Sequence, residues 1–338
     1  MITRILITVD PEIPVPPVGY GGIERIVDGL IMEFSKNGHE VYLLANSKST
    51  SKFAKQIFGW VGKDSSLRYT FINALQLRRT VNKIKPDVVH SFSRLLYLYP
   101  LFFSSSVKIV QSYQREISQK STNFAYILSR KRIMFTACAA HLFKNFKNKQ
   151  NWHAIYNFTG TEYFKPDEQK RRSYFVFLGR IEPIKGTYEA IQACIAANVK
   201  LVIAGNIPTE YQWYFDEKVK PYLKEGLIEY IGVVNDAQKL NLLQRAKAML
   251  FPIKWEEPFG IVMAESMACG TPVIAFKRGS VPEVIEKGVN GFVVENVLEM
   301  IDSIKIVSIV QSFQVRNIAV SKFSVTVIAK QYLSLYKS

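Results

Sequence analysis

Short apolar runs rich in β-branched residues alternate with helix-like stretches along most of this chain. In the first half, such runs lie at 4–10, 40–46, 87–92, 108–113, 133–138 and 153–156. Strands that are apolar on both faces are typical of parallel sheets whose two faces are covered by helices. The alternation therefore predicts an α/β protein built on doubly wound parallel sheets.

The pattern is interrupted once and then starts again. Residues 157–173 are polar and loop-like, and further apolar runs follow at 175–178, 200–204, 228–231, 249–252, 273–276 and 292–294. Because 338 residues exceed what a single core usually serves, we predict two Rossmann-like domains, 1–160 and 161–323. We expect them to face a central ligand cleft at their strand ends. A final amphipathic stretch at 324–336 has no strand after it.

The most informative stretch, 253–276, reads IKWEEPFGIVMAESMACGTPVIAF and carries Glu257 and Glu265 eight residues apart. We expect a helical stretch at 261–268; Pro258 and Gly260 suit the first turn of a helix, and a helix would separate the two acids by about 12 Å. That is roughly the distance from the hexose to the ribose of a nucleotide sugar, so each carboxylate could accept hydroxyl hydrogen bonds from one end of such a ligand. The alternative is an amphipathic helix with two solvated acids.

Backbone N–H groups and cations suggest where a diphosphate would bind. Gly21 and Gly22 precede an expected helix at 23–35, where free N–H groups favour anions, although a loop-closing glycine pair is the commoner explanation. Arg180 and Lys185 in FVFLGRIEPIKG could neutralise a leaving diphosphate. The sequence contains no DxD motif and its four histidines are scattered, so we expect no metal and no cofactor.

These motifs together resemble the retaining glycosyltransferases of family 4, which have the GT-B fold. The resemblance rests on the E-x7-E spacing, on YGGIERIV followed by NGHEVYLLA, and on G-R-x(4)-K-G; it is weak over 47–86 and 295–322. It implies transfer of a hexose from a nucleoside diphosphate sugar, with UDP favoured and GDP possible. The family pattern also implies that the stretch 324–338 packs back onto the first domain.

The same resemblance assigns roles to individual residues. Glu257 would face the donor sugar and Glu265 would bind the ribose, while Arg180 and Lys185 would stabilise the leaving diphosphate. The remaining donor-binding candidates are Gly21, Gly22, Gly232, Val233, Phe259, Gly260 and Ile261. Many relatives carry a histidine where this chain has Gln114, which cannot titrate near pH 7 and so leaves a general base in doubt. We interpret His90 as a satisfied buried histidine and Glu24 as a residue that orients its loop.

The charge is concentrated in the first domain. Residues 1–165 hold 23 Lys and Arg against 10 Asp and Glu, a net +13 of the total +16. Such a field attracts anionic lipid headgroups or polyanions, and Phe143 and Phe146 look exposed beside Lys144, Lys147 and Lys149. We therefore expect a peripheral enzyme on the cytoplasmic face of an anionic membrane, acting on a lipid-linked saccharide for a cell-surface polymer.

Several alternatives stay open at this point. For the acceptor, a small soluble saccharide is the second choice. For the function, the alternatives are a GT-B-fold enzyme of another reaction type, such as a sugar-nucleotide epimerase or a phosphorylase, and a non-enzymatic membrane-docking, nucleotide-binding protein. No nucleic-acid recognition motif is present. The longest apolar run, 95–103, is far shorter than the ~20 residues that span a bilayer, and the N-terminus lacks a signal-peptide layout. Cys138, Cys194 and Cys269 have no ligand-like spacing and predict core thiols in a reducing compartment.

Overall fold

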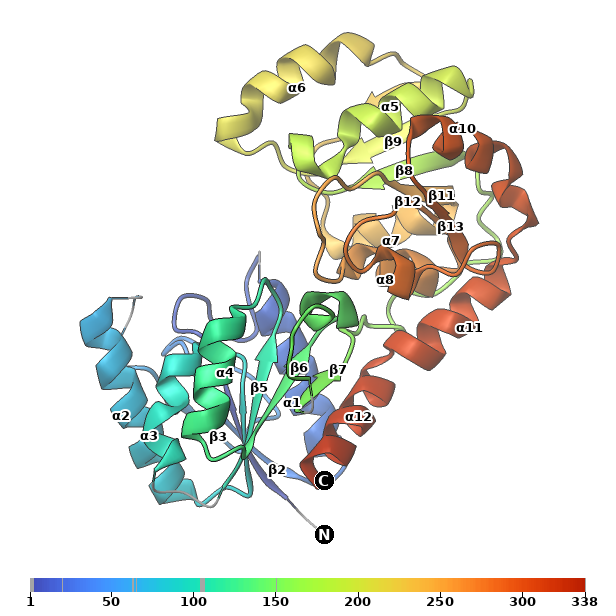
Figure 1. Cartoon of the computed structure of the whole chain (residues 1–338). Coiled ribbons are helices and arrows are strands. Elements are labelled where there is room, and N and C mark those ends of the chain that lie inside the picture. Colours follow the sequence, from blue (N-terminus) through green and yellow to red (C-terminus); the bar gives the residue numbers. More distant parts are fainter. Residues whose placement is uncertain are drawn as a thin grey trace. The chain divides into compact units, whose positions relative to one another are not determined.

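The computed structural model describes residues 3–19, 21–62, 64, 66–103, 107–149 and 151–337 (Figure 1). The chain divides into two compact units. Unit 1 comprises Met1–Asn157 and Val325–Ser338, and unit 2 comprises Phe158–Ser324. The predicted domain limits lie close to these bounds.

Unit 1 is built on a parallel sheet of seven strands in the order β3-β2-β1-β4-β5-β6-β7. The strands are β1 (Arg4–Thr8), β2 (Glu40–Ala45), β3 (Gln56–Gly59), β4 (Val88–Ser91), β5 (Lys108–Tyr113), β6 (Ile133–Ala137) and β7 (Trp152–Ala154). Every neighbouring pair is parallel, as the apolar runs predicted. Strand β3 was not predicted, because this edge strand is half-exposed and lacks the pattern of a buried run.

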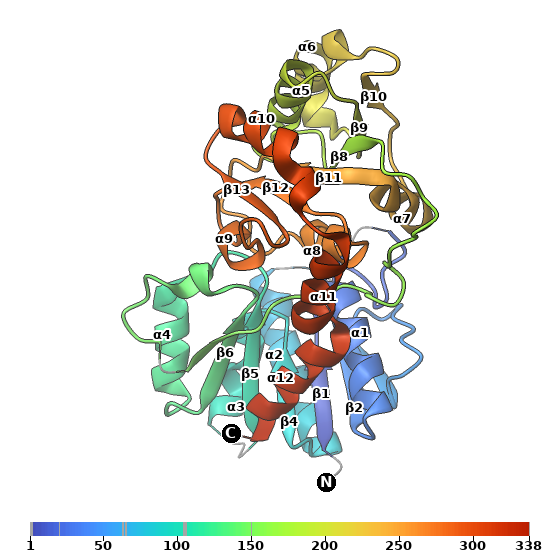
Figure 2. The same ribbon diagram turned by 90° about the vertical axis from the view of Figure 1, so that its right-hand side faces the viewer.

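Helices cover both faces of this sheet (Figures 1 and 2). One face carries α1 (Gly22–Lys36) and α12 (Val325–Lys337), and the other carries α2 (Leu67–Ile84), α3 (Tyr99–Phe102) and α4 (Gln119–Leu128). The short turns η1 (Leu95–Leu98) and η2 (Ala140–Phe143) contribute to the same hydrophobic cluster as α2. On α2, Ala74, Leu77 and Val81 face the core at helical spacing. The prediction that the final helix packs back onto the first domain is confirmed.

A buried polar network fastens α12 to the sheet. His90 on β4 is fully buried, and its Nδ1 is hydrogen-bonded to the Tyr336 hydroxyl at 2.6 Å while its Nε2 is hydrogen-bonded to the Ser112 hydroxyl at 2.6 Å. Burial lowers the pKa of His90 to about 3, so the ring is neutral at physiological pH. The interpretation of His90 as a satisfied buried histidine is confirmed.

Unit 2 contains a parallel sheet of six strands in the order β10-β9-β8-β11-β12-β13. The strands are β8 (Tyr174–Leu178), β9 (Leu201–Ala204), β10 (Ile228–Tyr230), β11 (Ala246–Phe251), β12 (Val273–Phe276) and β13 (Gly291–Val294). All of them match predicted apolar runs. The direction of strand order reverses between β8 and β11, which is where doubly wound sheets bind ligands at the carboxyl ends of their strands.

The helices of unit 2 form a layer on each face of the sheet (Figure 1). One layer holds α5 (Thr187–Ala196), α6 (Gln212–Lys218) and α10 (Val297–Ile306), and the other holds α7 (Asp236–Arg245) and α8 (Ile261–Ala268), against which α11 (Ser312–Phe323) packs. Shorter elements are η3 (Pro183–Lys185), η4 (Thr209–Tyr211), η5 (Lys220–Tyr222), α9 (Val281–Val284) and η6 (Val307–Ile309). Helices α10 and α11 lie in the segment where the family resemblance is weak.

Two predictions about side-chain environment have opposite outcomes. The three cysteines are buried and form no disulfide, as predicted, and burial raises the pKa of Cys269 to about 12. The prediction that Phe143 and Phe146 are exposed is wrong, because both rings pack on Trp152 with centroid distances of 5.2 and 5.4 Å. The helices also bear on membrane insertion. Among those that the structure describes, none is both long and apolar enough to cross a membrane.

Candidate functional site

Two of the predicted residues meet where the strand order of unit 2 reverses. Lys185, which follows β8, places its Nζ 2.8 Å from Oε2 of Glu257, which follows β11. The indole N–H of Trp255 donates to the same carboxylate oxygen at 3.0 Å, and the Lys185 ammonium lies 5.0 Å from the Trp255 ring. Both charged side chains are largely shielded from solvent, so the ion pair is stronger than an exposed one.

Backbone packing brings these two loops together. Gly186 has φ +78°, and a Cβ at this position would lie 2.8 Å from the carbonyl carbon of Pro252 and closer still to its oxygen. The N–H of Lys254 donates to Ile184 O at 2.8 Å, which joins the loop after β11 to the loop after β8. Only glycine permits this approach, which explains the residue after Lys185 in the G-R-x(4)-K-G motif.

A second glycine supports the loop that carries Glu257. Gly279 has φ +53°, and a Cβ there would lie 2.8 Å from Glu256 C and closer to the backbone N and O of Glu257. Next to it, the Ser280 N–H donates to Glu257 O at 3.0 Å, and the Ser280 hydroxyl donates to Phe259 O at 2.9 Å. This support was not predicted, since nothing in the local sequence pattern shows which backbone the turn after β12 contacts.

Glu265 lies on α8, whose bounds, Ile261–Ala268, confirm the helical stretch expected at 261–268, whereas the placement of Pro258 and Gly260 in its first turn is wrong. Gly260, at φ +73°, is the N-cap residue, so Pro258 and Gly260 precede the helix and do not form its first turn. The estimate of about 12 Å between the two carboxylates assumed a continuous helix and therefore does not apply. Lys239 on α7 reaches Oε1 of Glu265 at 2.7 Å, a partner that sequence analysis missed because it comes from a separate helix.

Two arginines hold the carboxyl end of α8. Arg172 donates to Cys269 O at 3.0 Å, and Arg316 donates to Ala268 O at 2.8 Å. Cations near the last carbonyl groups of a helix satisfy unpaired acceptors and interact favourably with the helix dipole. These contacts fix α8, and with it the position of Glu265.

The other predicted residues of unit 2 follow neighbouring strands. Arg180 follows β8, is half-exposed and pairs with buried Glu182 at 2.9 Å. Gly232 and Val233 follow β10; Gly232 O accepts from Gly205 N at 2.9 Å, and the Val233 side chain is exposed. Phe259 is buried against Phe323, and Ile261 is the first residue of α8. Because parallel strands end at one edge, the candidates from these strand ends share that edge of the sheet.

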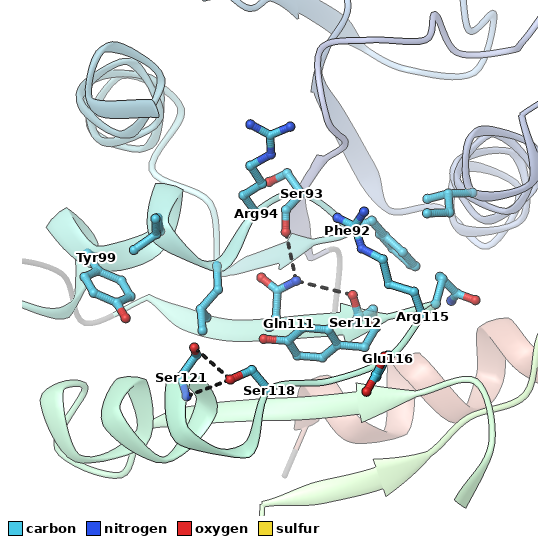
Figure 3. A pocket seen from close by; sticks show the side chains of 15 residues that line it. Phe92, Ser93, Arg94, Tyr99, Gln111, Ser112, Arg115, Glu116, Ser118 and Ser121 are labelled. Atoms are coloured by element: carbon cyan, nitrogen blue, oxygen red, sulfur yellow. Dashed lines mark hydrogen bonds between the residues drawn. The ribbon is translucent and has the colours of Figure 1, made fainter. Parts of the chain in front are cut away.

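Three candidates belong to unit 1. Gly21 is the N-cap residue of α1 and Gly22 its first residue; a Cβ on Gly21 would lie 2.6 Å from Pro17 Cβ, so close packing alone accounts for that glycine. Glu24 is buried in the first turn of α1, and burial raises its pKa. Gln114 lines a pocket of about 380 Å³ at the carboxyl ends of β4 and β5. Figure 3 shows this pocket.

Most residues of this pocket were not predicted. Its lining includes Arg94 and Tyr99 from the β4 side, Gln111 on β5, and Ser118 and Ser121 at the start of α4. Side chains brought together from several strand ends carry no local sequence signal. Among the described residues, no three His, Cys, Asp or Glu side chains gather as metal ligands.

Two family models match the chain in succession. Residues 20–148 match the family described as "Glycosyltransferase Family 4", and residues 159–307 match "Glycosyl transferases group 1". The chain belongs to these glycosyltransferases, and its two parallel-sheet units have the GT-B fold.

Three further matches cover nearly the whole chain, and the two solved structures among them share its fold. The chain is 24% identical to an uncharacterized 41.2 kDa protein in the cps region of Klebsiella pneumoniae, covering 94% of this chain and 97% of that protein. A glycosyltransferase structure from Rickettsia africae has a TM-score of 0.83 at 18% identity, covering 99% and 98% of the two chains. HepE of Anabaena in complex with UDP-glucose has a TM-score of 0.75 at 17% identity, with 99% of each chain covered.

Proposed function

We propose that this glycosyltransferase moves a hexose from a UDP-sugar to a saccharide, with retention of the anomeric configuration. The observation that carries the proposal is the shielded cluster of Lys185, Glu257 and Trp255 at the point where the strand order of unit 2 reverses. UDP is favoured over GDP because a similar structure was determined with UDP-glucose. Unit 2 would then be the donor domain.

Each group in unit 2 has a role in this reaction. Lys185 gives up part of its pairing with Glu257 when a diphosphate arrives, and with Arg180 it stabilises the charge that develops on the leaving phosphate. Glu257 accepts hydrogen bonds from the sugar hydroxyls, together with N–H groups of Phe259, Gly260 and Ile261. The remaining assignments in this unit are the ribose to Glu265 and the base to Gly232 and Val233.

The chemistry balances without a cofactor. The acceptor oxygen forms a bond to the anomeric carbon on the face from which the diphosphate departs, and its proton moves to a phosphate oxygen of the donor. Cationic side chains perform the charge stabilisation that a divalent ion supplies in other transferases, so we propose that no metal is needed. We also propose that Gly21 and Gly22 contribute to diphosphate binding and that Gln114 forms a hydrogen bond to a sugar hydroxyl.

Calorimetry and product analysis test the proposal. UDP should bind to the full-length protein more tightly than GDP, and incubation with a UDP-hexose should yield free UDP and an α-linked product from an α-linked donor. Failure of both nucleotides to bind would exclude the donor assignment. A β-linked product would exclude retention, and a converted nucleotide sugar without transfer would favour an epimerase.

We further propose that unit 1 docks on the anionic, cytoplasmic surface of a membrane and that the acceptor is lipid-linked. Besides the net charge of +13 over residues 1–165, α4 supports this idea. On this helix Phe124 and Ile127 are 56% and 71% exposed, and Lys120 lies one turn before Phe124. Exposed apolar side chains next to cations are typical of helices that lie in a membrane interface.

Co-sedimentation with lipid vesicles tests the docking proposal. Binding should require anionic lipid, weaken as salt rises, and decrease when Lys144, Lys147 and Lys149 become Glu. The pair Phe124→Ser and Ile127→Ser should also reduce it, whereas Leu298→Ser, at a residue of unit 2 that is 74% exposed, should not. Absence of binding at low salt would contradict docking and favour a soluble saccharide acceptor.

A further inference from the structure

The pocket in unit 1 contains a buried side chain whose hydrogen bonding is incomplete. Gln111 on β5 is 1% exposed, and its amide nitrogen donates to Ser93 O at 2.9 Å and to Ser112 O at 3.3 Å (Figure 3). Its carbonyl oxygen has no hydrogen-bond partner among the described residues. A buried carbonyl oxygen without a donor is uncommon, and a ligand that supplies an O–H or N–H group would complete it.

The orientation of the Gln111 amide is determined by its neighbours. Both partners of the nitrogen are backbone carbonyl groups, which only accept hydrogen bonds. Turning the amide over would place its oxygen against these two acceptors and leave the nitrogen without them. The oxygen is therefore the free group, and the ligand must be a donor.

A second carboxamide in the same pocket also lacks a hydrogen-bond donor. The carbonyl oxygen of Gln114 is also buried and without a partner among the described residues. Hydroxyl groups of Tyr99, Ser118 and Ser121 add groups that both donate and accept. A ligand that satisfies this lining carries several hydroxyl groups on one small frame, and about 380 Å³ is within the range of about 300–1,000 Å³ that small-molecule sites occupy.

The charges around the pocket argue against an anionic ligand. Arg94 pairs with Glu12 at 2.7 Å, and Arg115 lies 3.5 Å from Asp10. Glu116 also lines the pocket. The two arginines are therefore balanced by nearby carboxylates, in contrast to the basic character of unit 1 as a whole.

We propose that this pocket binds one neutral hexose unit, with the carbonyl oxygen of Gln111 accepting a hydrogen bond from one of its hydroxyl groups. That this hexose is the sugar of the acceptor rests on the proposed transferase function. Binding itself does not, since every lining residue belongs to unit 1. An uncharged sugar fits both the unpartnered carbonyl oxygens and the balanced arginines.

Ligand-detected NMR on the full-length protein tests this site without any donor. The probes are the methyl α-glycosides of glucose, galactose and mannose, the monodeoxy analogues of whichever binds, and methyl α-glucuronide. At least one neutral glycoside should bind at millimolar concentration. One monodeoxy analogue should bind about 10-fold more weakly to the wild type, the loss expected for one buried hydrogen bond.

A matched pair of variants assigns the effect to Gln111. Gln111→Met should bind the parent glycoside more weakly and no longer distinguish it from that monodeoxy analogue, whereas Gln56→Met, at an exposed glutamine on the edge strand β3, should behave as the wild type. The proposal is overturned if no neutral glycoside binds, if the glucuronide binds best, or if Gln111→Met keeps the discrimination. Failure of UDP to bind would leave these results unchanged and would affect only the donor assignment.

Discussion

Gly279 offers the sharpest test of how the Glu257 loop is held. We expect Gly279→Ala to destabilise unit 2 through two separable effects. An alanine at φ +53° costs about 1–2 kcal/mol relative to glycine because the left-handed region crowds its Cβ. The Cβ would also overlap backbone atoms of Glu256 and Glu257, and overpacking of this kind costs about 1–3 kcal/mol more.

Gly288 provides the control for backbone strain alone. It has φ +79°, and a Cβ there would meet no atom within 4 Å. Gly288→Ala should therefore lose only the first contribution. The additional loss in Gly279→Ala corresponds to roughly 2–4 °C in the melting temperature for each kcal/mol in a unit of this size.

Thermal unfolding and turnover should be measured together for both variants. If the loop moves to relieve the overlap, Glu257 leaves Lys185, and transfer from a UDP-hexose should fall at least 10-fold even where stability is retained. Equal melting temperatures and equal turnover in the two variants would refute the view that Gly279 positions Glu257.

Three further outcomes are expected. Glu265→Ala should weaken UDP binding in calorimetry by about 1.5–3 kcal/mol, the value of a hydrogen bond to a charged group. Glu257→Gln should leave UDP binding unchanged and reduce turnover. Unchanged UDP binding by the Glu265 variant would refute the ribose assignment. Activity should survive EDTA, and complete loss that Mg²⁺ or Mn²⁺ restores would contradict the roles given to Arg180 and Lys185. Burial lowers the pKa of His90 to about 3, so below about pH 6.5 the unfolded chain binds a proton that the folded chain does not. The stability of unit 1 should therefore fall as the pH drops, by about 2 kcal/mol between about pH 7 and pH 5. Hydrogen exchange of the β4 amides measures this loss, and a pH-independent opening free energy would show that His90 titrates normally.

Most strands were predictable because a strand that is buried on both faces consists of consecutive apolar residues. Every residue of β8 and β12 is buried, and both appear as unbroken apolar runs. By contrast, β3 is a half-exposed edge strand, and it was missed. At α8 the apolar stretch predicted the helix bounds correctly, but it did not show that Gly260, at positive φ, is the N-cap residue and that Pro258 lies before the helix.

The candidate site could be predicted only in its charged residues. Glu257 and Lys185 stand in motifs that resemble a known family, but their ion pair depends on Gly186 and Gly279, whose close contacts are formed by segments distant in sequence. Lys239 and Gln111 were missed for the same reason. Tertiary packing, which a single sequence does not display, decides which side chains meet and which oxygen atoms are left without a donor.

The network around His90 has a consequence for biosynthesis. Strand β4 belongs to the first part of the chain, yet the hydroxyl that closes its hydrogen bonds comes from Tyr336, which is translated only after all of unit 2. Until then, the face of the sheet that α12 covers lacks its last helix. Unit 2 is a single continuous segment and can fold before α12 is made. A ribosome-bound chain stopped before Val325 would therefore expose apolar surface on unit 1 and be a target for chaperones.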